Sequence, residues 1–118
     1  MTPFGRKIRE MRREKGVTLT EMATALEVSP AYLSALEHGR RGRPSLLLQH
    51  QIFAYFNIIW DEAEALQRLA WLSHPRVVVD TSGLGPDAVE LANLLAERIR
   101  TLPAETIAKM LDEVRREE

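Results

Sequence analysis

Residues 18–39 carry the stretch TLTEMATALEVSPAYLSALEHG, and the spacing of its apolar residues decides the fold. Met22 and Leu26 lie four positions apart, on one face of a short helix. Leu33 and Leu36 lie three positions apart, on one face of a second helix. The pattern therefore predicts two short helices that pack against each other at a steep angle.

The same stretch contains signals for where both helices begin. Thr18 and Glu21 have the spacing of a capping box at the start of the first helix. Ser29 followed by Pro30 is an N-cap with proline at the first helical position. The turn between the helices needs positive φ, which costs about 1 kcal/mol at Glu27 because it is not glycine. We interpret the stretch as a helix-turn-helix whose second helix leaves its outer face open to a DNA major groove, the alternative being an ordinary helical hairpin.

Three more helices are predicted beside this motif by the helical spacing of apolar residues, at about residues 3–15, 45–56 and 62–72. Asn57 is expected to end the second of these helices in the left-handed conformation. Asp61 and Glu64 are expected to cap the third helix, with Trp60 packed against Ala65 as a hydrophobic staple. Together with the motif, these helices would form one five-helix domain.

The N-terminal part of the chain resembles the phage-repressor class of regulators, known as the XRE family. The resemblance covers about residues 3–72, and the matching residues are Phe4 to Arg12, Ala23, Ser29, Leu33, Ser34, Glu37, Gly39 and Arg43 to Ser45. It implies a five-helix domain whose third helix is the recognition helix. It also implies sequence-specific DNA binding and regulation of transcription, usually by a dimer.

The resemblance implies two groups of DNA-contacting residues. The base-facing positions would be Pro30, Ala31, Tyr32, Ser34 and Ala35. Phosphate contacts would come from Arg6, Arg13, Thr18, Arg40, Arg41 and Arg43. Proline and alanine cannot form hydrogen bonds with bases through their side chains, so specificity is expected to depend also on the loop arginines and on DNA shape.

A third implication of the resemblance is structural. Arg12 and Glu37 match a family pair that forms a partly buried salt bridge between the first and third helices. Loss of one partner would leave the other charge buried without a partner and lower the free energy of unfolding by about 3 kcal/mol.

The charged residues are divided unevenly along the chain. The net charge is −1, but residues 1–44 contain nine Lys/Arg and five Asp/Glu, whereas residues 45–118 contain seven and twelve. The basic half carries the motif, which is typical of a surface that meets phosphates. No cysteine, signal-peptide apolar region or run of about 20 apolar residues is present, so we expect a cytoplasmic, nucleoid-associated protein.

The sequence contains no pattern of catalytic or metal-binding residues. His38, His50 and His74 do not have metal-ligand spacing, and there is no phosphate-binding loop. We therefore expect no enzyme activity, no catalytic residues, no bound metal and no cofactor.

The C-terminal part has a different character. Residues 73–86 are predicted to be a linker that contains a short strand at residues 76–79, where three valines adjoin. A strand in a helical protein needs a partner, and a second subunit is the simplest one. Residues 87–118 are predicted to be a helical hairpin that buries too little apolar surface to fold well alone. We assign the hairpin to dimerisation, with packing onto its own domain as the alternative.

Taken together, the sequence predicts an all-α protein with a DNA-binding domain at residues 1–72 and a dimerisation hairpin at residues 87–118. The predicted function is that of a dimeric transcriptional repressor that recognises an inverted repeat in double-stranded DNA through residues 30–38. The main alternative is an antitoxin whose acidic C-terminal half neutralises a toxin partner. A ligand-sensing regulator is a further alternative.

Overall fold

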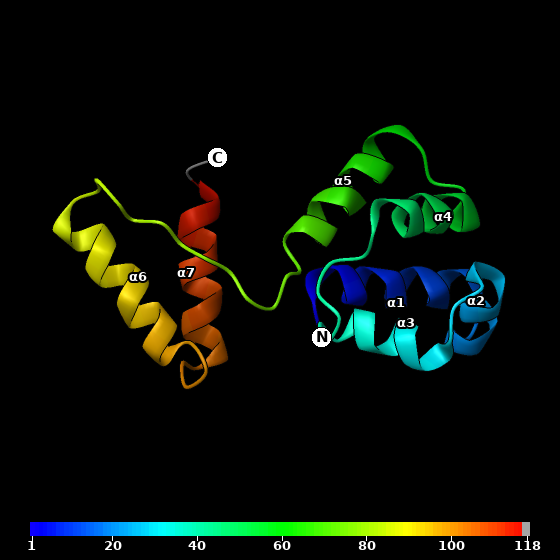
Figure 1. Ribbon diagram of the computed structural model, residues 1–118, viewed down its shortest axis with the longest axis horizontal. Helices are drawn as coiled ribbons and strands as arrows, with labels where there is room; N and C mark the ends of the chain where they lie inside the picture. Colours follow the sequence, from blue (N-terminus) through cyan, green and yellow to red (C-terminus); the bar gives the residue numbers. More distant parts are fainter. Residues whose placement is uncertain (117–118) are drawn as a thin grey trace. The chain divides into compact units, whose positions relative to one another are not determined.

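The structure is a computed structural model that describes residues 1–116. These residues form seven α-helices (Figure 1): α1 (Pro3–Lys15), α2 (Leu19–Leu26), α3 (Pro30–Glu37), α4 (Leu46–Phe56), α5 (Trp60–Trp71), α6 (Pro86–Arg98) and α7 (Ala104–Arg116). The chain divides into two compact units, Met1–Val77 with α1 to α5 and a second unit from Val78 onwards with α6 and α7. The all-helical fold is as predicted.

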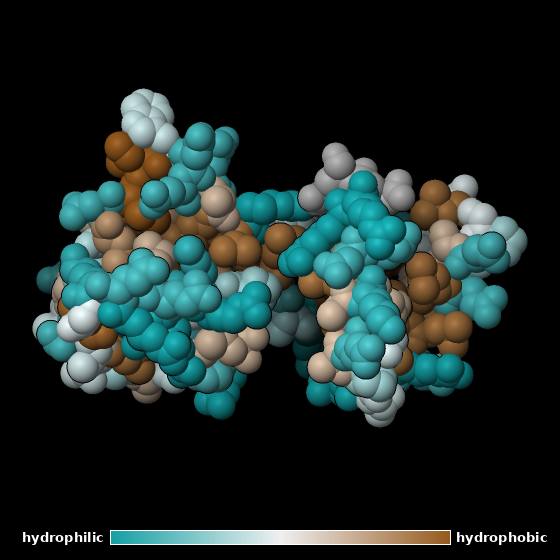
Figure 2. All heavy atoms as spheres, turned by 180° about the vertical axis from the view of Figure 1, so that it is seen from behind, coloured by the Kyte–Doolittle hydropathy of each residue, from teal (hydrophilic) through white to brown (hydrophobic). Residues whose placement is uncertain are grey.

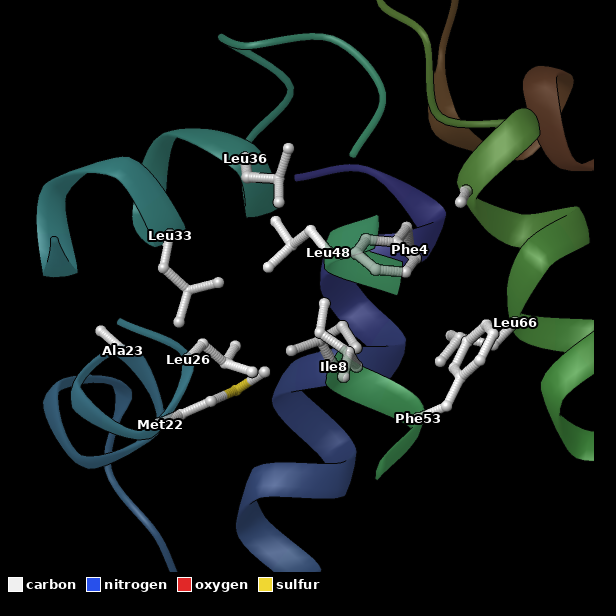
Figure 3. Close-up of a cluster of buried hydrophobic side chains, with 12 residues drawn as sticks. Phe4, Ile8, Met22, Ala23, Leu26, Leu33, Leu36, Leu48, Phe53 and Leu66 are labelled. Atoms are coloured by element: carbon white, nitrogen blue, oxygen red, sulfur yellow. The ribbon is translucent and has the colours of Figure 1, made fainter. Parts of the chain in front are cut away.

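The hydrophobic core of the first unit lies between its five helices. Helix α1 packs against α3 and α5, and α2 packs against α3 and α4. Ile8 of α1, Leu26 of α2, and Leu33 and Leu36 of α3 are buried and lie close together in the core (Figure 3). The apolar residues that predicted α2 and α3 from the sequence are therefore the residues that pack these helices against α1.

The ends of α2 and α3 have the predicted capping interactions. The Thr18 hydroxyl accepts a hydrogen bond from the Glu21 N–H at 3.0 Å, and the Glu21 carboxylate accepts one from the Thr18 N–H at 3.1 Å. The Ser29 hydroxyl accepts from the Tyr32 N–H at 3.0 Å. Glu27 has a φ of 58°, so the turn takes the left-handed conformation that its position requires.

The start of α5 differs from the prediction. Helix α5 begins at Trp60, its N-cap is Ile59, and no side chain caps it, so the predicted capping box of Asp61 and Glu64 is absent. The Trp60 side chain is 82% exposed, which also rules out the predicted staple against Ala65. The physical reason is that α5 begins one residue before Asp61, so that Asp61 lies inside the helix and cannot serve as its N-cap. Trp60, the first residue of the helix, has a φ of 55°.

The predicted strand at residues 76–79 is wrong. Within residues 1–116 there is no β-strand, and Val77, Val78 and Val79 lie exposed in irregular backbone. A strand requires a neighbouring strand with which to exchange backbone hydrogen bonds, and this segment has none in the described chain. The preference of valine for extended backbone is therefore not sufficient to make a strand here.

The second unit is a pair of helices with no buried residue in α6 or α7. Leu94 and Met110 are half-buried, whereas Leu91 and Leu111 are exposed. Apolar side chains therefore reach the surface of this unit, where Figure 2 shows brown areas among hydrophilic ones.

Candidate nucleic-acid interface

Helix α3 is attached to the start of α1 by backbone contacts at its C-terminal end. The Thr2 N–H and hydroxyl both donate to the Glu37 carbonyl, at 3.0 and 3.1 Å. Gly5 lies directly against the same residue, so that a Cβ on Gly5 would come within 2.7 Å of the Glu37 Cα. These contacts hold α3 in one position on the domain.

The Arg12–Glu37 ion pair predicted from the resemblance is present. The Arg12 Nη2 donates to both carboxylate oxygens of Glu37, at 2.9 and 3.0 Å, and the Glu37 side chain is only 2% exposed. Burial raises the pKa of the Glu37 carboxyl above its usual value, while the charge of Arg12 acts in the opposite direction. The Arg12 Nε is buried and has no hydrogen-bond partner in residues 1–116. The pair therefore joins α1 to α3 and takes the charge of Arg12 away from the surface.

Helix α3 also carries the residues expected to face bases. Pro30 and Ala31 are exposed, whereas Tyr32, Ser34 and Ala35 are half-buried. Tyr32 packs against the core and, with Ser45 and Leu47 at the start of α4, lines a hollow beside the N-terminal half of α3. Of these five side chains, only those of Tyr32 and Ser34 can form hydrogen bonds.

The loop after α3 carries three exposed arginines, and two of them contact aromatic rings. The Arg41 Cζ lies 5.8 Å from the centroid of the Tyr32 ring. The Arg43 Cζ lies 4.8 Å from the centroid of the Trp71 ring, and its Nε donates to the Trp71 carbonyl at 3.0 Å. No such contact is found for Arg40 within residues 1–116. These pairs could not be predicted from the sequence, because Tyr32 and Trp71 are distant from their arginines along the chain.

The remaining predicted phosphate-binding residues lie on α1 and at the start of α2. Arg6 and Arg13 are exposed and seven residues apart, so they lie on the same side of α1. The Thr18 hydroxyl already accepts the capping hydrogen bond, which leaves its proton available to a phosphate oxygen.

Within residues 1–116, no group of three or more His, Cys, Asp or Glu side chains could hold a metal ion. In the same part of the chain, no helix is both long and apolar enough to cross a membrane.

Comparison with known proteins agrees with this geometry. The family model described as "Helix-turn-helix domain" matches residues 3–56. The HTH-type transcriptional regulator SinR of Bacillus subtilis (strain 168) is 32% identical over 55 residues, which are 47% of this chain and 50% of SinR. The HTH-type transcriptional repressor RghR of the same organism is 41% identical over 44 residues, which are 37% of this chain and 33% of RghR.

A third relative, the uncharacterized HTH-type transcriptional regulator RghRB of Bacillus subtilis (strain 168), is also 41% identical over 44 residues, 37% of this chain and 32% of that protein. The chain thus spans between about a third and a half of the length of the curated relatives it matches. No solved structure gives a significant match. Residues 3–56 are a helix-turn-helix domain like those of HTH-type transcriptional regulators, in agreement with the resemblance to the XRE family.

Proposed function

We propose that this chain is a sequence-specific DNA-binding transcriptional regulator, and that it acts as a dimeric repressor on an inverted repeat in double-stranded DNA. The observation that carries the proposal is the position of α3. One side of this helix is buried against α1 and α2, and its start presents Pro30 and Ala31 to solvent. A helix held in this way can enter a major groove without any change in the domain.

The proposal assigns the DNA contacts to two groups of residues. The base-facing group is Pro30, Ala31, Tyr32, Ser34 and Ala35. The phosphate-contacting group includes Arg6, Arg13, Thr18 and Arg40. All four of the latter residues are exposed, and the three arginines have no salt-bridge partner within residues 1–116. Their charges are thus available to phosphates.

The proposal divides the chain into a DNA-binding domain at residues 1–72, a linker at residues 73–86 and a dimerisation hairpin at residues 87–118. Residues 117 and 118 lie outside the described part of the chain. The hairpin is assigned to dimerisation because Ile107, Leu111 and Val114 form one continuous apolar stripe on α7 that is left exposed. A second copy of the hairpin offers the same stripe and can cover it by two-fold symmetry.

DNA recognition is tested by selecting binding sites from random DNA with the full chain. We expect an inverted repeat with half-sites about 10 base pairs apart, centre to centre. The variant Ala31→Asp places a negative charge on the exposed start of α3 and should abolish binding. Ala65→Asp places the same charge on α5, which lies on the other side of α1 from α3 (Figure 1), and should leave binding intact. Equal effects of the two variants, or no enriched sequence, would contradict the proposal.

Dimerisation is tested by light scattering of the full chain at micromolar concentration. The chain has a mass of 13.4 kDa, so we expect a particle of twice that mass. Leu111→Glu adds a charge to the middle of the exposed apolar stripe on α7 and should shift the protein toward monomer. Asn93→Glu adds the same charge to an exposed polar position on α6 and should not. A monomeric wild type would reject the dimer and would favour the alternative, in which the exposed stripe binds a partner protein such as a toxin.

A further inference from the structure

The contact between Arg41 and Tyr32 places a charged group beside the recognition helix. Tyr32 occupies the third position of α3, and its half-buried ring packs against the core. The Arg41 guanidinium lies over this ring, with its Cζ 5.8 Å from the ring centroid. Although Arg41 follows α3 in the sequence, its charged end therefore lies beside a side chain from the first turn of the helix.

The ring restricts where the guanidinium can go. An arginine side chain on an exposed loop samples many rotamers, and ordering it costs conformational entropy. Attraction between a guanidinium and the face of an aromatic ring offsets part of this cost before DNA binds. Within residues 1–116 Arg41 has no salt bridge and no side-chain hydrogen bond, so its donors remain available.

The neighbouring arginines differ from Arg41 in this respect. Arg43 is bound to the end of α5 through its hydrogen bond to the Trp71 carbonyl and its position over the Trp71 ring. Arg40 is exposed, and no aromatic ring lies against it in the described part of the chain. Arg41 is thus the loop arginine that α3 itself positions.

We propose, resting on the DNA-binding function above, that Arg41 is a base-reading residue that recognises a guanine, and that the Tyr32 ring is its platform. Arginine donates two parallel hydrogen bonds to the O6 and N7 atoms of guanine in the major groove. The exposed start of α3 offers Pro30 and Ala31, whose side chains cannot make such bonds. Arg41 supplies the missing donors, and this replaces the phosphate contact expected from the sequence.

The test measures binding of the full chain to its selected site and to sites in which each guanine is replaced in turn. Arg41→Lys keeps the positive charge but cannot donate the bidentate pair of hydrogen bonds that a guanidinium gives. It should reduce the preference for one guanine by about 10- to 100-fold, and leave the dependence of affinity on salt unchanged. Replacing that guanine by 7-deazaguanine, which lacks the N7 acceptor, should weaken wild-type binding and have little effect on the variant.

Two matched substitutions separate the platform from other roles. Tyr32→Leu removes the ring and should reduce the preference for the same guanine, whereas Tyr32→Phe keeps the ring and should retain the preference. Arg76→Lys, at an exposed arginine outside α3 and the loop that follows it, should retain it too. Far-UV circular dichroism of each variant should match the wild type, because Arg41 and Arg76 are exposed and Tyr32 is only half-buried.

The proposal is overturned if Arg41→Lys keeps every guanine preference of the wild type. It is also overturned if Tyr32→Phe and Tyr32→Leu lose the preference equally, because the hydroxyl would then be the reading group. Failure of the underlying function looks different, since the wild type itself would then show no preference among DNA sequences.

Discussion

Removing Arg12 should destabilise the first unit by leaving the Glu37 carboxylate buried without a partner. The Glu37 side chain is 2% exposed and that of Arg12 is 11% exposed, so water can replace little of the lost interaction. Breaking one side of a buried ion pair costs about 3–5 kcal/mol. The total free energy of unfolding of a domain is about 5–15 kcal/mol, so the predicted effect is large. We expect Arg12→Met to lower the free energy of unfolding by about 3 kcal/mol at pH 8.

The cost should depend on pH in a defined direction. Burial raises the pKa of Glu37, and Arg12 opposes this, so loss of Arg12 raises the pKa further. A carboxyl whose folded-state pKa is raised takes up a proton more readily in the folded state. Its contribution to stability is therefore complete below the unfolded pKa and is lost as the pH rises through the folded pKa. The cost of Arg12→Met should accordingly be smaller at pH 5 than at pH 8.

The double variant Arg12→Met/Glu37→Met provides the comparison that isolates the pair. It removes both charges and also the buried Arg12 Nε, which has no hydrogen-bond partner in residues 1–116. Replacing a buried pair by apolar side chains is often neutral, so we expect the double variant to lie within about 1 kcal/mol of the wild type. The free-energy change of the double variant should then differ from the sum of those of Arg12→Met and Glu37→Met by at least about 2 kcal/mol.

Urea unfolding of the full chain, followed by tryptophan fluorescence and far-UV circular dichroism, measures these differences. Trp60 and Trp71 are the two tryptophans of the chain, and both lie in the first unit. Arg13→Met, at the exposed neighbouring position, is the control and should change stability by less than about 0.5 kcal/mol. The reasoning is refuted if Arg12→Met costs less than 1 kcal/mol at pH 8, or if the double variant costs as much as the two single variants together.

Three other predictions concern packing. Gly5→Ala should destabilise the first unit more than any surface change, because the added Cβ would overlap the backbone of α3. Gly16→Ala should cost only about 1 kcal/mol, because Gly16 has a positive φ but open space around it. Urea unfolding measures the free energy of unfolding of both variants. Trp71→Ala should release Arg43 and speed hydrogen exchange in the loop after α3, with no effect expected on exchange in the second unit. Val78→Lys should leave both stability and oligomeric state unchanged, because that residue is 96% exposed in a segment without strand structure; a shift toward monomer in light scattering would show that the segment does pair.

The helices and most of their ends, though not the start of α5, could be predicted from the sequence because the interactions that define them are local. Thr18 and Ser29 cap their helices through backbone N–H groups three residues away. Glu27 and Asn57 take the left-handed conformation where the chain must leave a helix. The apolar spacing of α2 and α3 likewise predicted which side chains enter the core.

Other features were decided only by the tertiary structure, since they depend on groups that are distant along the chain. The valines near residue 78 have the local preference for a strand, but no neighbouring strand is present in the described chain. Asp61 and Glu64 have the spacing of a capping box, but Asp61 lies inside α5 and cannot serve as its N-cap. The approach of Arg41 to Tyr32 and of Arg43 to Trp71 depends on how the loop packs. Side-chain spacing specifies faces of helices, whereas only packing brings separate elements within contact distance.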